Sequence, residues 1–232
     1  MPCKPSGLQQ LPNRQSSIVN RKFSPRLPDE YAGHYSEHAD TIRGRLLEFR
    51  AVPSSEYLYE LFYCLLTPQS RAVHAEAVIA RLRALGFPEN RIDPTPHLRD
   101  PAHYIRFHNQ KSARLTAAAE RSREIMNVLL APDLSAAERR EWLVSNVRGL
   151  GWKEASHFLR NIGFLELAII DRHILKHMLR CGAIDSIPKS IGTRRTYLDL
   201  EERFRALADA AGLPLQELDL LFWSFEEGSV RK

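Results

Sequence analysis

The chain has 232 residues, of which 44% are hydrophobic, and a net charge of +5 at neutral pH. This length is enough to bury one large core or two closely packed lobes. The N-terminus has no apolar block as long as that of a signal peptide, and no window approaches the roughly 18 apolar residues of a membrane-spanning helix. We therefore expect an intracellular protein without membrane contact. Cys3, Cys64 and Cys181 form no C-x-x-C pair, which argues against a disulfide framework or a zinc or iron–sulfur site, and no cofactor is expected.

Residues 1–30 are predicted to form a basic arm that precedes the folded part, residues 31–232. The first 26 residues contain no acidic side chain and five basic ones: Lys4, Arg14, Arg21, Lys22 and Arg26. Four prolines and few apolar residues make independent folding unfavourable. Such an arm could lie along DNA by electrostatic attraction, or it could be a terminus without a role.

Beyond the arm, apolar residues recur with the period of a helix. Helices are predicted around residues 42–49, 58–66, 73–85, 111–130, 171–180, 194–211 and 215–227, with a proline-punctuated loop at 91–99 and a basic loop around Pro188. Ser135 and Glu138 have capping-box spacing and are predicted to start one more helix. Because no convincing pair of strands is present, we expect an all-α fold of two helical lobes with the active site in the cleft between them.

The stretch from Val147 to Asp171, VRGLGWKEASHFLRNIGFLELAIID, carries the strongest functional signal. Gly149 and Gly151 form a turn before a segment with helical spacing, which predicts a helix-hairpin-helix at about residues 147–163. Glycines let backbone N–H groups approach a partner closely, and the start of the following helix is electropositive, so the turn suits a DNA phosphate. Lys153 stands at the start of that helix, and Asp171 follows eighteen positions later.

The segment GLGWKEASHFLRNIG, followed by IIDRHIL, resembles the catalytic helix-hairpin-helix of the DNA glycosylase superfamily. It is most similar to the archaeal-type 8-oxoguanine DNA glycosylase/AP lyases, and further segments agree from about Tyr57 onwards. The resemblance implies that the Lys153 amine attacks C1′ of the damaged nucleotide, displaces the base and forms a Schiff base, after which β-elimination cleaves the strand. It also implies that Asp171 stabilises the oxocarbenium-like sugar and assists the proton transfers.

Spacing alone leaves simpler interpretations of both residues open. Lys153 could be a solvated lysine that contacts a phosphate, and Asp171 could be an ordinary helix N-cap. A carboxylate can fill the cap and the catalytic role together. His173 is expected to be structural, because its spacing does not relate it to the other two.

Other segments of the resemblance suggest how the lesion is extruded and recognised. Gln69, in the turn LLTPQSR, would fill the hole left by the flipped nucleotide, although a proline-induced turn with an exposed glutamine has the same pattern. Trp223 would stack on the base, and the carboxylate of the terminal Lys232 would reach the pocket. Phe107 would supply the second stacking face or belong to the core, and one of Phe222 and Trp223 should be a core residue.

The sequence therefore predicts a monomeric, DNA-associated repair enzyme that excises 8-oxoguanine from double-stranded DNA and then cleaves the strand. One alternative is another enzyme of the same superfamily, a glycosylase for oxidised pyrimidines or alkylated bases, because Lys153 and Asp171 indicate the reaction and not the damaged base. A second is a non-catalytic helix-hairpin-helix module that grips the DNA backbone through amides. Such a module would need neither the lysine nor the aspartate.

Overall fold

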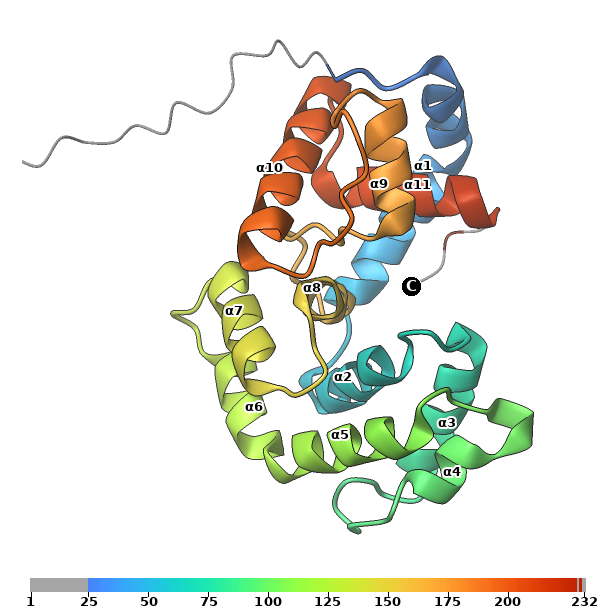
Figure 1. The fold of residues 1–232 in the computed structure, drawn as a ribbon, viewed down its shortest axis with the longest axis vertical. Coiled ribbons are helices and arrows are strands. Elements are labelled where there is room, and N and C mark those ends of the chain that lie inside the picture. The colour runs from blue at the N-terminus through green and yellow to red at the C-terminus, as the bar shows by residue number, and fades with distance from the viewer. Residues whose placement is uncertain (1–24, 229, 231–232) are drawn as a thin grey trace, which may run out of the picture.

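The computed structural model describes residues 25–228 and 230, and every regular element in this part of the chain is helical (Figure 1). The α-helices are α1 (Asp29–Arg50), α2 (Tyr57–Leu66), α3 (Ala72–Ala84), α4 (Thr95–Arg99), α5 (His108–Glu120), α6 (Ser122–Leu130), α7 (Ala136–Asn146), α8 (Trp152–Asn161), α9 (Arg172–Arg180), α10 (Arg194–Ala211) and α11 (Leu215–Glu227). Two 3₁₀ turns, η1 (Ser54–Glu56) and η2 (Pro101–His103), complete the set. The all-α prediction is confirmed.

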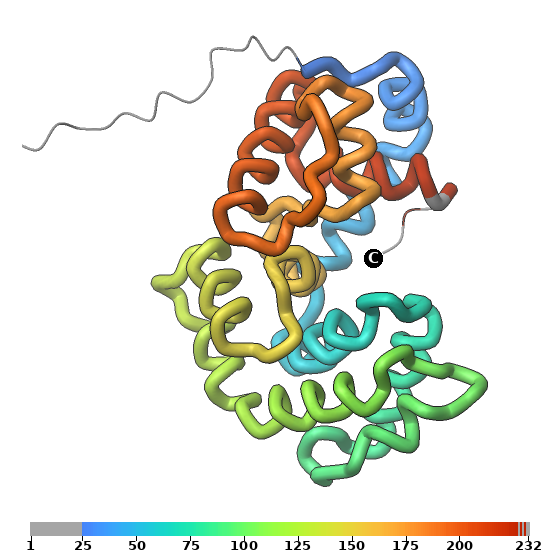
Figure 2. The backbone as a smooth tube through the Cα atoms, viewed as in Figure 1, coloured from blue at the N-terminus to red at the C-terminus, as the bar shows by residue number. Residues whose placement is uncertain are grey.

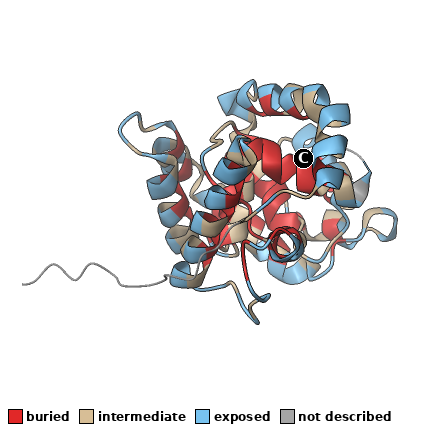
Figure 3. Ribbon diagram, turned by 90° about the horizontal axis from the view of Figure 1, so that it is seen from above, coloured by how far each residue is buried: buried red, intermediate tan, exposed pale blue. Residues whose placement is uncertain are grey.

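The helices form two lobes that the chain visits in the order upper, lower, upper (Figure 2). Helix α1 lies with α9, α10 and α11 in the upper lobe of Figure 1, whereas α2 to α7 form the lower lobe. Helix α8 lies between the lobes and packs against α1, α2 and α7. The inner faces of the helices are buried and their outer faces are exposed (Figure 3).

Each lobe has its own hydrophobic core. One core is built around Leu61, Phe62 and Leu115 of the lower lobe, and the other around Tyr31 and Phe204 of the upper lobe. Helix α8 serves both cores, because Ala155, Phe158 and Leu159 belong to the first and Trp152 to the second. Burial on two sides fixes this helix in place relative to both lobes.

The structure differs from the predicted helix boundaries at three places. Helix α1 already begins at Asp29, within the predicted arm, because Pro28 starts it and Asp29 and Glu30 favour its first turn. The predicted loop at 91–99 contains the short helix α4, which has a proline in its first turn. The single helix predicted for residues 111–130 is broken at Arg121, which lets α6 turn so that Ile125 and Leu129 enter the core.

Other local predictions are confirmed. Ser135 and Glu138 form the expected reciprocal capping box at the start of α7. Helices α10 and α11 begin and end at the residues predicted for them, 194–211 and 215–227. No helix in the described part of the chain is both long enough and apolar enough to cross a membrane.

Candidate active site

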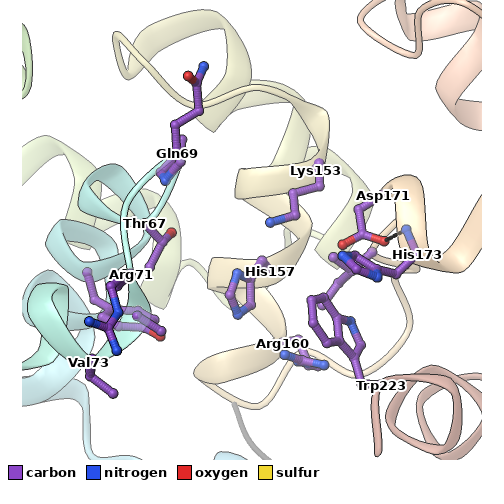
Figure 4. A pocket seen from close by; sticks show the side chains of 14 residues that line it. Thr67, Gln69, Arg71, Val73, Lys153, His157, Arg160, Asp171, His173 and Trp223 are labelled. Carbon is purple, nitrogen blue, oxygen red and sulfur yellow. Dashed lines mark hydrogen bonds between the residues drawn. The ribbon is translucent and has the colours of Figure 1, made fainter. Parts of the chain in front are cut away.

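A cavity of about 680 Å³ opens between the two lobes (Figure 4). Its walls come from the turn after α2 in the lower lobe, from α8 between the lobes, and from the start of α9 and the middle of α11 in the upper lobe. Volumes of about 300–1,000 Å³ are typical of small-molecule and cofactor pockets. Among the residues predicted from the sequence, the cavity brings together Gln69, Lys153, Asp171 and Trp223.

Helix α8 presents three nitrogen-bearing side chains to the cavity: Lys153, His157 and Arg160. Their positions differ by four and then three residues, so they lie above one another on one face of the helix. The opposite face carries the buried side chains of Ala155, Phe158 and Leu159. The core side of α8 thus determines where its polar side points, and Figure 4 shows Lys153 and His157 extending into the cavity.

The glycine turn before α8 has the conformation that the sequence predicts. Gly149 has a φ of +99°, in the region that side chains disfavour, and Gly151 is the N-cap of the helix. A Cβ atom at Gly149 would lie 2.5 Å from Cδ of Arg114, a residue of α5. A side chain at Gly149 would therefore require the Arg114 side chain to move, in addition to the unfavourable positive φ.

Asp171 is the N-cap of α9 and also lines the cavity. Its Oδ1 accepts hydrogen bonds from the backbone N–H groups of His173 and Ile174, both at 2.9 Å. Figure 4 shows the carboxylate facing the cavity on the side of Lys153 and His157. The capping interpretation is thus confirmed, and the cap leaves the carboxylate at the cavity wall.

The buried extended segment before Asp171, residues 167–170, is held by side chains of α10. The Tyr197 hydroxyl donates to the carbonyl of Ala168 at 2.9 Å and accepts from the N–H of Ile170 at 3.1 Å. Glu201 accepts from the N–H of Ala168 at 2.8 Å and forms a buried ion pair with Arg140 at 2.7 Å. These contacts satisfy backbone groups that water cannot reach, and they fix the point at which Asp171 emerges.

A buried ion pair lies at the base of the cavity. Arg160 donates to Asp219 of α11 at 2.6 Å, and neither side chain is more than 3% exposed. Burial raises the pKa of Asp219, the positive charge of Arg160 partly opposes this rise, and the nearby Asp171 adds to it, which together give a pKa of about 6. The protonation of Asp219 therefore depends on the charges around it, immediately beneath the predicted catalytic residues.

Helix α11 also contributes the aromatic wall. Trp223 is partly exposed in the cavity, whereas Phe222 is fully buried in the upper core, so the expectation that one of them is a core residue is confirmed. The ring of His173 lies against Trp223 with centroids 5.2 Å apart. His173, expected to be structural, is thus part of the cavity lining.

The other predicted site residues lie further out. Gln69 stands at the exposed tip of its turn with a φ of +57°, which places it at the mouth of the cavity. Phe107, which is 44% exposed at the start of α5, is not among the residues that line the cavity. Lys232 and most of the predicted arm, residues 1–24, lie outside the described residues.

Sequence reasoning missed several polar residues at or next to this cavity, among them His157, Arg160 and Asp219. The spacing of His157 and Arg160 from Lys153 was a usable signal, because residues four and seven positions along a helix share a face. Asp219 had no such signal. Its partner is distant in the sequence, and an acidic residue in an amphipathic helix ordinarily faces solvent.

Comparisons with known proteins point to one family. A family model described as 8-oxoguanine DNA glycosylase matches residues 42–213. An 8-oxoguanine DNA glycosylase/AP lyase of Fusobacterium nucleatum is 36% identical over 211 residues, which are 85% of this chain and 94% of the relative. The crystal structure of the Methanocaldococcus jannaschii 8-oxoguanine DNA glycosylase is similar with a TM-score of 0.75 and 31% identity, over 88% of this chain and 95% of that one. The same enzyme solved with a 15mer DNA containing 8-oxoguanine gives a TM-score of 0.76, over 88% and 98% of the two chains.

Proposed function

Because the chain belongs to the 8-oxoguanine DNA glycosylase family, we propose that its interlobe cavity receives an extruded 8-oxoguanine nucleotide and that Lys153 is the nucleophile. The protein is a DNA repair glycosylase with AP lyase activity. The observation that carries the residue assignment is the convergence of Lys153 and Asp171, eighteen positions apart, on one cavity. A non-catalytic DNA-binding module would have no use for this arrangement.

In the first step, the neutral amine of Lys153 attacks C1′ of the damaged nucleotide and the bond between C1′ and the base breaks. The base leaves with the bonding electron pair and takes up a proton. The Asp171 carboxylate, held by two N–H groups of α9, faces the site where positive charge develops on the sugar. Its fixed orientation means that no reorganisation is needed as that charge appears.

In the second step, the sugar ring opens and the lysine nitrogen becomes doubly bonded to C1′ as a Schiff base. Loss of a proton from C2′ then expels the 3′ phosphate by β-elimination. Water hydrolyses the remaining Schiff base and returns the free amine of Lys153. Asp171 lines the same cavity as Lys153 and can assist the proton transfers.

Residues at the mouth and on the walls of the cavity would extrude the damaged nucleotide and recognise its base. Gln69, at the tip of its turn, would enter the duplex and replace the flipped nucleotide, which offsets part of the few kcal/mol lost in stacking and pairing. The partly exposed indole of Trp223 would stack on the purine, and Lys232 would supply a further contact to the base. Phe107 would contribute a stacking face only if DNA binding brought it to the base. We also propose that the enzyme acts as a monomer on duplex DNA inside the cell.

Borohydride trapping tests this proposal. A duplex with one 8-oxoguanine opposite cytosine is incubated with the wild type, with Lys153→Gln and with Lys189→Gln, an exposed lysine outside the cavity. We expect a covalent adduct with the wild type and with Lys189→Gln, none with Lys153→Gln, and none on a plain guanine duplex. Binding without any adduct would support a non-catalytic module. Trapping on an oxidised pyrimidine alone would keep the mechanism and reject the purine pocket.

A further inference from the structure

Lys111 is a buried cation in the middle of the lower lobe. It lies on α5 and is only 1% exposed. Its ammonium group donates to the carbonyls of Leu66 and Pro68, both at 2.6 Å, and to the hydroxyl of Ser70 at 3.0 Å. No acidic side chain in the described part of the chain forms an ion pair with it. Three neutral acceptors therefore hold this charge.

All three acceptors belong to one short segment, residues 66–70. Leu66 is the last residue of α2, so its carbonyl has no partner within that helix. Gln69 lies between Pro68 and Ser70, and its φ of +57° is uncommon for a residue other than glycine. Such a conformation persists only where the surroundings impose it. The turn has its own hydrogen bond, from the N–H of Ser70 to the carbonyl of Thr67 at 2.9 Å, and Lys111 constrains it further by donating on both sides of Gln69.

A second contact of the same segment involves the start of α5. The Ser70 hydroxyl also accepts a hydrogen bond from the backbone N–H of Arg106 at 3.0 Å. One turn beyond Lys111 on the same helix, Arg114 packs against Gly149 of the glycine turn. Helix α5 thus contacts both the turn that carries Gln69 and the turn that precedes Lys153, and it fixes their relative position.

We propose that Lys111 is a positioning residue for lesion extrusion, which holds the turn at residues 66–70 so that Gln69 projects into the duplex. This inference rests on the proposed function of Gln69. The ammonium group fits the role because it has three N–H donors for three acceptors on a turn that no helix or sheet stabilises. A misplacement of about 1 Å caused by a change away from the reacting atoms can cost about 100-fold in rate.

Burial of this charge is unfavourable in itself. Loss of hydration, together with the smaller effect of the neighbouring positive charge of Arg114, lowers the pKa of Lys111 to about 8. An apolar residue of similar length would avoid this cost but would leave the carbonyls of Leu66 and Pro68 without donors. The geometry of the turn is therefore maintained at the cost of burying a positively charged ammonium group.

The test compares Lys111→Met with Arg139→Met in the full chain. Arg139 is a matched control because it is also buried in the lower lobe and also donates to backbone carbonyls, those of Leu129, Ala131 and Leu134, but it lies outside the interlobe cavity. Single-turnover excision of 8-oxoguanine is measured on a fully paired duplex and on the same lesion inside a small unpaired bubble. Thermal unfolding of each variant is recorded in parallel.

We expect Lys111→Met to lose about 10- to 100-fold on the paired duplex and much less on the bubble, where extrusion needs little help. Arg139→Met should change the excision rate on the duplex and on the bubble by the same factor. The double variant Gln69→Ala, Lys111→Met should be no slower on the duplex than Gln69→Ala alone, because both substitutions remove one function. Should Lys111→Met not fold, Ser70→Ala removes one acceptor and should shift the ratio in the same direction.

Three outcomes would overturn the proposal while leaving the proposed function intact. These are a wild-type rate for Lys111→Met, an equal loss on both substrates, and additive losses in the double variant. If instead the wild type excises nothing from the paired duplex, the proposed function fails first and the role of Lys111 falls with it.

Discussion

Replacing Tyr197 by phenylalanine should destabilise the protein far more than the loss of one oxygen atom suggests. The Tyr197 side chain is fully buried, and its hydroxyl serves both the carbonyl of Ala168 and the N–H of Ile170. Leaving a buried polar group without a partner costs about 1–3 kcal/mol. Two such groups therefore give a loss of about 2–6 kcal/mol in the free energy of unfolding. For a protein of this size that corresponds to a drop in Tm of at least about 4 °C.

The assay is urea unfolding followed by circular dichroism, with Tyr59→Phe as the matched control. The Tyr59 hydroxyl donates to the carbonyl of Phe87 at 2.7 Å, but its side chain is only partly buried, so water can replace the lost donor. We expect a loss of about 1 kcal/mol or less for this control. Equal losses for the two variants, at an unchanged slope with urea, would refute the idea that the segment before Asp171 depends on Tyr197.

Three further predictions concern single residues of the site and its support. Asp171→Asn keeps a good N-cap, so the free energy of unfolding in urea should change by less than about 0.5 kcal/mol. The single-turnover rate of excision should fall at least about 100-fold, because the negative charge is lost. An excision rate that falls only as far as the loss of stability explains would leave capping as the only role of Asp171. Gly149→Ala should weaken duplex binding in fluorescence anisotropy about tenfold, because its φ of +99° disfavours a side chain. In the control Gly44→Ala the added methyl group meets open space, so duplex binding should stay unchanged. Between pH 8 and pH 10.5 the folded chain releases the proton of Lys111 before the unfolded chain does. The free energy of unfolding of the wild type, relative to that of Lys111→Met, should therefore rise with pH by up to about 3 kcal/mol. A difference between the two proteins that stays constant or falls with pH would contradict the lowered pKa.

The parts of the fold that could be predicted from the sequence are those with local causes. Helix α10 begins after the Thr193 side-chain cap and ends at Gly212, whose positive φ stops it, and both signals are visible in the residue types. Lys153 and Asp171 could be found for a similar reason, since the glycine turn and the apolar run before the aspartate fix their local positions. Spacing along one helix could also have identified His157 and Arg160.

The parts that could not be predicted depend on partners distant in the sequence. Lys111 stands in a helix rich in alanine, where a lysine ordinarily faces solvent, and only its position beneath the end of α2 explains its burial. Asp219 is likewise buried because α11 passes behind Arg160 of α8. Phe107 has the sequence pattern of a core aromatic, but a φ of +60° at the start of α5 leaves it exposed.

The division of the protein into two cores also bears on how its substrate range can evolve. Asp171 and Trp223 depend on the packing of the upper lobe, whereas the Gln69 turn depends on α5 of the lower lobe. Substitutions that reshape the wall around Trp223 would thus leave the Gln69 turn unchanged. A lineage could acquire a new damaged base as substrate through changes in one lobe while it inherits the other unaltered. Helix α8, which belongs to both cores, is the element least free to vary.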